Sequence, residues 1–146
     1  MEDLQALIST FHHQINIQIR FKDIDKLGHV NNANHLTYFE MGRVTYFDDV
    51  FRDKINWEQI SMILAKSEIN YKRPITLSDK LICYTKISKL GIKSFDTDYL
   101  LVANNNNELE LCAYGKSVMV CYNYITKQTI EIPQEWISSI KEFETI

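Results

Sequence analysis

The hydrophobic and polar positions of this chain change their spacing near the N-terminus. Between Phe11 and Lys22, apolar residues at every second position alternate with polar ones, which is typical of a half-buried strand. From Asn32 to Phe51, apolar residues recur at helical spacing and few strong breakers interrupt the run, so it predicts one long helix. The apolar stripe that we predict for this helix consists of Leu36, Glu40, Val44, Phe47 and Phe51.

The predicted helix carries signals for its start and for its packing. Asn31, Asn32 and Asn34 are each suited to cap its N-terminus. Gly42 in its middle costs about 1 kcal/mol relative to alanine, a cost that close approach to a sheet or to a partner helix would offset. Glu40 lies on the predicted stripe, and we expect it to pair with Arg43, three residues later.

The rest of the chain predicts strands joined by short turns. The residues that separate these strands are Pro74, Ser78 with Asp79, Gly91 and the run 104–107. Gly115 predicts a bulge inside the last strand. We expect strands at 61–73, 80–90, 92–103 and 108–125, a loop or short helix at 53–60, and helices at 134–142 and, unless it is a frayed tail, at 1–10.

This order of elements favours one α+β domain over residues 1–146. Consecutive strands joined by short turns pair antiparallel by default. One long helix and an antiparallel sheet each bury one face against the other. The sequence therefore predicts an antiparallel five-stranded sheet wrapped around one long central helix.

Composition and charge exclude several kinds of partner. The net charge is −3 and the chain has no basic run, so we expect no nucleic-acid partner. Three cysteines without CxxC spacing predict neither a disulfide framework nor a zinc site, and the histidines lack the spacing of metal ligands. The sequence begins with no hydrophobic signal region and contains no apolar run long enough for a membrane span. We therefore expect a cytoplasmic protein without a membrane partner.

The candidate chemistry lies where the first predicted strand leads into the long helix. Two carboxylates, Asp23 and Asp25, and a histidine, His29, stand in this joint. The first amides of a helix have no partner within it, and its dipole favours negative charge at that end. The joint is therefore suited to a polarised oxygen and to a carboxylate that acts on it.

The joint also resembles a known active-site motif. The motif reads Asp23-x-Asp25-x-x-Gly28-His29-Val30-Asn31-Asn32, followed by Tyr38-Phe39-Glu40-x-x-Arg43. It resembles the motif of hotdog-fold acyl-CoA thioesterases of the 4-hydroxybenzoyl-CoA type and is similar to that of plant acyl-acyl-carrier-protein (acyl-ACP) thioesterases. The resemblance implies the hotdog fold, hydrolysis of acyl-CoA or acyl-ACP without metal or cofactor, and a homodimer or a dimer of dimers.

The resemblance assigns roles to individual residues of the motif. It implies that Asp25 attacks the thioester carbonyl or activates water, whereas an aspartate there can also simply cap the loop. It places the oxyanion donor at the backbone amide of Asn32, with Val30 and Asn31 lining the approach. Gly28 either admits the substrate close to the backbone or is an ordinary turn glycine.

Two further assignments leave alternatives open. His29 matches a catalytic histidine of the plant enzymes, but Leu27 stands where they have an asparagine, so His29 is either catalytic or a loop hydrogen-bonding residue. Lys93 and Ser94 match the strand start at which related thioesterases contact the coenzyme A phosphates, and a solvated surface is the alternative. The competing functions are a hydratase or dehydratase of acyl thioesters, a non-catalytic acyl-thioester-binding or regulatory protein, and a structural domain without a ligand.

Overall fold

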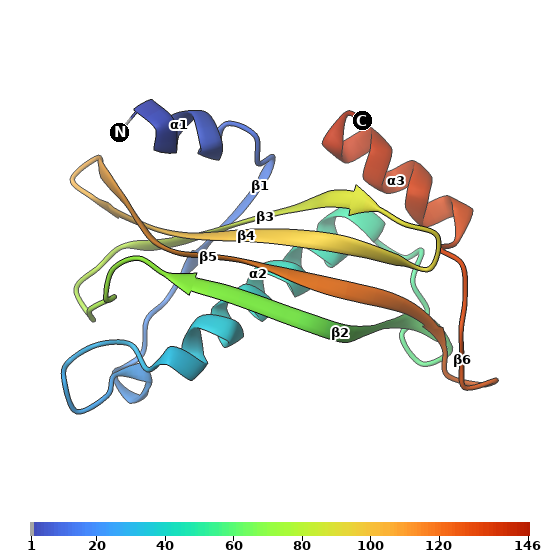
Figure 1. Ribbon diagram of the computed structural model, residues 1–146, viewed down its shortest axis with the longest axis horizontal. Coiled ribbons are helices and arrows are strands. Elements are labelled where there is room, and N and C mark those ends of the chain that lie inside the picture. The colour runs from blue at the N-terminus through green and yellow to red at the C-terminus, as the bar shows by residue number, and fades with distance from the viewer. Residues whose placement is uncertain (1) are drawn as a thin grey trace.

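A curled antiparallel sheet wraps around one long helix in the computed structural model, which describes residues 2–146 (Figure 1). The elements in chain order are α1 (Glu2–Ile8), β1 (His13–Ile17), the 3-10 turn η1 (Phe21–Asp23), α2 (Asn32–Phe51), β2 (Ile60–Tyr71), β3 (Leu81–Leu90), β4 (Ser94–Asn105), β5 (Glu108–Asn123), β6 (Gln128–Thr129) and α3 (Gln134–Glu144). The strands β1 to β5 and the central helix confirm the predicted α+β arrangement.

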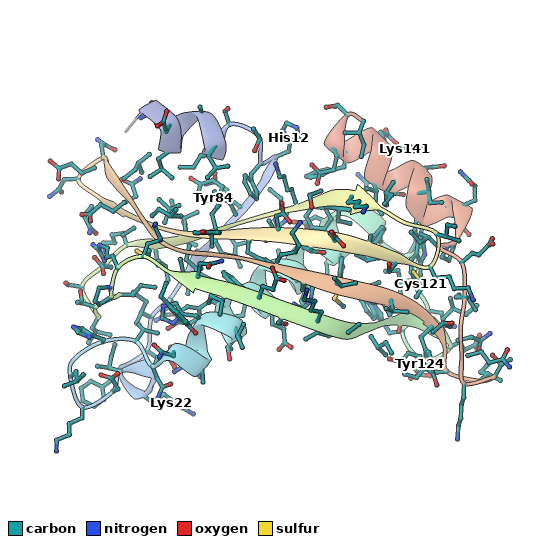
Figure 2. The ribbon with its side chains drawn as sticks, viewed as in Figure 1. His12, Lys22, Tyr84, Cys121, Tyr124 and Lys141 are labelled. Carbon is teal, nitrogen blue, oxygen red and sulfur yellow. The ribbon has the colours of Figure 1, made fainter. Side chains whose placement is uncertain are left out.

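The strand order in the sheet is β1-β3-β4-β5-β2, with antiparallel neighbours throughout, and the short β6 pairs with β5. Successive side chains point to opposite faces, so Cys83 and Leu101 pack in the core beneath α2 while Tyr84 and Leu100 pack on the other face. Figure 2 labels Tyr84 on this outer face, where α1 covers part of the sheet. The order leaves β1 and β2 at the two edges of the sheet.

The central helix begins and ends at the predicted residues. Asn31 is the capping residue, because its side-chain oxygen accepts a 3.0 Å hydrogen bond from the amide of Ala33. Gly42 faces the sheet, as expected, and a Cβ atom there would lie 2.7 Å from both Cys83 Sγ and Thr85 Oγ1. The helix therefore approaches β3 more closely than a larger residue would permit.

The predicted apolar stripe is wrong for the first half of α2. Leu36, Glu40 and Val44 are exposed, although Phe47 and Phe51 are buried as expected. Apolar residues occur on two sides of this half, and the sheet covers the side that contains Gly42. The buried residues of α2 are His35, Tyr38, Phe39, Gly42, Arg43, Tyr46, Phe47, Val50 and Phe51.

The first strand is shorter than the alternation predicts. It ends at Ile17, which pairs with Leu81, the first residue of β3. Beyond this point the chain has passed the end of its partner strand, so residues 18–22 have no ladder to join despite their alternating pattern. The remaining strands and α3 lie within two or three residues of their predicted bounds.

The predicted bulge at Gly115 is also wrong, because this residue pairs regularly with Tyr99 and Ile69 on its two sides. The register of β5 against β4 shifts instead near Cys112. A glycine is needed for space: a Cβ atom at position 115 would overlap the carbonyl oxygen of Glu68 and lie 2.7 Å from Phe39 Cε2.

Replacing Gly115 with alanine is expected to destabilise the fold by about 3 kcal/mol, because the overlap is with backbone that cannot rotate away. In thermal unfolding this corresponds to a Tm lowered by about 6–12 °C for a chain of this size. Gly28→Ala is the matched control and should cost only about 1 kcal/mol, since Gly28 has a φ of 81° but no atom lies within 4 Å of where its Cβ would stand. A smaller effect at Gly115 than at Gly28 would contradict the account.

No helix within residues 2–146 combines the length and the apolar character needed to cross a membrane.

Candidate functional site

The loop that joins η1 to α2 is fixed at both of its ends. Ile24 and Val30 pair in an isolated antiparallel bridge, and the amide of Asn31 donates a 2.8 Å hydrogen bond to the carbonyl of Asp23. The amide of Val30 donates a 2.7 Å bond to the carbonyl of Ile75 in the β2–β3 connection. The loop is therefore closed on itself and attached to the sheet.

Asp25 lies within this loop with its carboxylate only partly engaged. Its Oδ1 accepts hydrogen bonds from the amide of Leu27 at 2.8 Å and from the amide of His29 at 3.2 Å. Among the residues that the structure describes, no group bonds to Oδ2. Asp25 thus caps the loop with one oxygen and leaves the other, on a half-buried side chain, free to act as a base or nucleophile.

The first residue of α2, Asn32, supplies an unpaired donor. Within residues 2–146, its backbone amide makes no hydrogen bond to protein, since the helix begins at this residue. The side chain of the neighbouring Asn31 is occupied by its capping bond to Ala33. A free amide at a helix N-terminus is the kind of group that stabilises a developing oxyanion.

These groups face a cavity of about 370 Å³ between the loop, the first turn of α2 and the end of β2. Gly28 shapes the loop beside it with a φ of 81°, in the left-handed region that glycine adopts without strain. Six of the residues that line the cavity are Asp25, His29, Val30, Asn32, His35 and Tyr71. The structure therefore brings the predicted carboxylate, amide and histidine of the motif together.

The side chain of His29 makes no hydrogen bond to another described residue, although its backbone exchanges bonds with Asp25. Its Nδ1 and Nε2 therefore do not hold the loop together. The alternative that His29 serves only as a hydrogen-bonding residue of the loop has no support in this geometry.

Asp23 fixes the start of the loop through buried hydrogen bonds. Its buried carboxylate accepts bonds from Tyr38 Oη at 2.8 Å and from Arg20 through both the backbone amide and the guanidinium. Burial opposes ionisation of this carboxyl, but the bonds from Arg20 and Tyr38 outweigh it and lower the pKa of Asp23 below its usual value. Its backbone carbonyl also accepts a bond from Asn34 Nδ2. One residue thus ties the loop to the chain before it and to α2.

A second ion pair supports the other wall of the cavity. Arg73 donates two hydrogen bonds, at 2.8 and 3.0 Å, to the carboxylate of Asp79, and a third at 2.9 Å to Glu110. The hydrogen bonds from Arg73 lower the pKa of Asp79 far below its usual range. This network stabilises the β2–β3 connection, in which the carbonyl of Ile75 accepts the hydrogen bond from Val30.

Lys93 and Ser94 lie at the other end of the sheet. Ser94 pairs with Val120 of β5, and Val120 pairs on its other side with Ile63 of β2. The cavity lies at the opposite end of β2, beyond Tyr71. Eight residues along a strand span about 26 Å. Figure 2 makes the separation visible, since Cys121, whose amide bonds to the carbonyl of Lys93, lies at the end opposite to Lys22 of η1. A single protomer does not bring Lys93 to Asp25.

His35 also lines the cavity, although we did not predict it from the sequence. It is buried one turn into α2, with its ring edge-on to Tyr71 at a centroid distance of 4.9 Å. Burial lowers the pKa of its imidazole, which favours the neutral form of the ring. The available signal was its position three residues after Asn32, on the same side of the helix.

The predicted ion pair between Glu40 and Arg43 is present, with Oε2 and Nη2 3.6 Å apart. Glu40 itself points to solvent, while the buried Arg43 also donates a 3.0 Å hydrogen bond to Tyr99 Oη.

Comparison with known proteins identifies close resemblances over most of the chain. Residues 19–140 match the Thioesterase-like superfamily. The long-chain acyl-CoA thioesterase FadM of Escherichia coli is 32% identical over 125 residues, which cover 84% of this chain and 92% of that protein.

Two solved structures show the same arrangement of helices and strands. A thioesterase from Thermus thermophilus, crystallised with coenzyme A and zinc, superposes with a TM-score of 0.82 at 30% identity, covering 94% of this chain and 97% of that one. A variant 4-hydroxybenzoyl-CoA thioesterase with bound 4-hydroxybenzoyl-CoA gives a TM-score of 0.78 at 17% identity, covering 87% and 96%, which shows a shared fold.

Proposed function

Because the chain belongs to the Thioesterase-like superfamily, we propose that it hydrolyses acyl-CoA thioesters in the cavity beside Asp25. The chain is a thioester hydrolase with the predicted hotdog fold. Acyl-CoA as the substrate is supported by the activity named for FadM and by the coenzyme A bound to the Thermus thermophilus thioesterase.

One observation carries the proposal for the site: Asp25, whose Oδ2 is free, and Asn32, whose backbone amide is unpaired within the described chain, line the same cavity. The thioester carbonyl oxygen would accept a hydrogen bond from the Asn32 amide, where negative charge develops in the transition state. A preorganised donor of this kind is typically worth about 3–4 kcal/mol. Asp25 then either attacks the carbonyl carbon or removes a proton from the attacking water.

Thiol release from a panel of short, medium, long and aromatic acyl-CoAs tests the proposed substrate. We expect saturable turnover of at least one class, with the preferred acyl group set by the cavity. Turnover of acyl-ACP without turnover of any acyl-CoA would replace the proposed substrate, and tight binding without hydrolysis would favour a non-catalytic binding protein.

We further propose that two copies pair through β2. This strand forms one edge of the sheet, and its outer side has no partner in the described chain. Exposed apolar side chains flank that edge, namely Ile63 and Leu64 on β2 and Leu36, Met41 and Val44 on α2. Burying this surface against a second copy would join the two sheets. It would also cover Leu36 and Val44, the apolar residues of the predicted stripe that are exposed in one protomer.

Such a dimer would also account for Lys93 and Ser94. Two-fold pairing of β2 with its copy is antiparallel, so the far end of the partner's sheet would approach the cavity end of this one. Lys93 and Ser94 of the partner subunit would then stand near the Asp25 cavity, where a lysine can contact a coenzyme A phosphate. The proposed site is therefore incomplete in one protomer.

Replacing Val44 with glutamate is expected to convert the dimer to a monomer and to lower kcat/KM for acyl-CoA at least about tenfold, since a buried unpaired charge opposes association. Sedimentation should give a mass near twice 17.2 kDa for the wild type and near 17.2 kDa for the variant. Ile146→Glu, at an exposed apolar position on the last residue of the chain, is the control and should remain dimeric. A monomeric, fully active wild type would contradict the proposal.

A further inference from the structure

We propose that His35 is a second catalytic residue, which activates the water that releases the acyl group from Asp25. The inference rests on the proposed function and takes its nucleophilic form, in which Asp25 becomes acylated. The imidazole of His35 lies in the same cavity as the Asp25 carboxylate and the Asn32 amide. It is held there by the packing of α2 against the end of β2.

The tautomer of His35 is set by its backbone neighbour. Its Nδ1 lies 3.4 Å from the carbonyl oxygen of Asn31, and because a carbonyl can only accept, Nδ1 carries the proton. Nε2 therefore carries the lone pair. Within residues 2–146 no protein group bonds to Nε2, and it is not among the buried polar atoms that are sealed off without a partner. His35, which lines the cavity, thus has a basic nitrogen with no protein partner.

The ring is held as well as oriented. Tyr71 contacts it edge-on with an interplanar angle of 79°, and Tyr71 Oη donates a 3.4 Å hydrogen bond to the carbonyl of Asn32. The imidazole therefore lies between the first turn of α2 and the end of β2, with its orientation restricted by both. A base whose ring is fixed relative to the oxyanion donor needs little reorganisation during the reaction.

The chemistry balances without a co-reactant. Oδ2 of Asp25 attacks the carbonyl carbon, the C–S bond breaks, and the coenzyme A thiolate departs. Water then attacks the acyl carbon of the mixed anhydride while its proton passes to Nε2 of His35, and the C–O bond to Asp25 breaks. The departed thiolate takes up a proton from water and Nε2 returns its proton to water, which leaves the carboxylic acid, the free thiol and both side chains in their starting states.

The pH dependence follows from the need for a neutral imidazole. The other titratable groups that line the cavity are Asp25, His29, Tyr71, Lys72 and Arg73. Burial lowers the pKa of His35, so kcat should fall only as the pH drops below the usual histidine value of about 6.5. This acidic limb should disappear when His35 is replaced, whereas a limb that belongs to another group of the cavity would persist.

The test is pre-steady-state thiol release by His35→Gln, using the acyl-CoA that the wild type turns over best. We expect a burst of about one thiol per active site, followed by turnover at least about 100-fold below that of the wild type, because deacylation loses its base. The burst should be absent in the Asp25→Asn/His35→Gln double variant. Exogenous imidazole should raise the turnover of His35→Ala at least tenfold above its turnover without imidazole.

Controls separate this role from a structural one. His12→Gln alters an exposed histidine between β1 and α1, remote from the cavity, and should behave as the wild type (Figure 2). A folded His35→Gln variant with kcat within tenfold of the wild type would overturn the inference, as would loss of turnover with neither burst nor imidazole rescue. Either result with an active wild type leaves the proposed function standing, whereas an inactive wild type removes both.

Discussion

Asp25→Asn is expected to lower kcat for thioester hydrolysis at least about 100-fold while leaving the fold intact. The substitution removes the charge from Oδ2, the oxygen that no other described residue engages, and so removes the base or nucleophile. The asparagine Oδ1 can still accept the bonds from the Leu27 and His29 amides that hold the loop. Steady-state thiol release, measured beside circular dichroism and sedimentation, checks the expectation.

The matched control is Asp53→Asn, at an exposed aspartate beyond the end of α2 that makes no side-chain hydrogen bond to the described chain. It should retain the activity of the wild type. A well-folded Asp25→Asn variant with kcat within tenfold of the wild type would remove Asp25 from the chemistry and leave it as a residue that caps the loop.

Asp23→Asn should produce the second large effect, this time on stability as well as on rate. The variant loses the ion pair with Arg20 and weakens the charge-assisted bond from the buried Tyr38, with a combined cost of about 3 kcal/mol. The Tm should fall by about 6–12 °C. Because Asp23 positions the loop without facing the cavity, kcat should fall at least about tenfold while KM changes little.

The pH dependence of this stability difference has a definite sign. The pKa of Asp23 is lower in the folded chain than in the unfolded one, so its carboxylate stabilises the fold above about pH 4, the unfolded value, and this contribution is lost as the pH falls through the folded pKa. Denaturant unfolding should therefore show the difference between wild type and Asp23→Asn shrinking below about pH 4. A difference that grows in acid would contradict the assigned hydrogen bonds.

The residues near α2 show what the sequence could predict. The bounds of the helix followed from an uninterrupted run with an asparagine cap, and both signals are local. The side of the helix that is buried, in contrast, is not determined by a local signal. Leu36 and Val44 are as apolar as Phe47, and only the approach of Gly42 to β3 decides between the sides.

The candidate site shows the same division. The motif placed Asp25 and the Asn32 amide in one loop, because its residues are adjacent in sequence. His35 escaped notice because its significance depends on Tyr71, thirty-six positions later, which closes the cavity around it. The separation of Lys93 from Asp25 within one protomer depends on strand register, and the approach proposed for them depends on a second copy. Neither can be derived from spacing along the chain.

The most direct test of the central claim is a crystal structure of Asp25→Asn with an intact acyl-CoA that the wild type hydrolyses. We predict that the thioester carbonyl oxygen lies within about 3 Å of the Asn32 amide nitrogen, with residue 25 beside the carbonyl carbon. Binding of the thioester elsewhere, for example in the groove of about 380 Å³ that Leu7, Phe11 and Tyr114 line beneath α1, would contradict it.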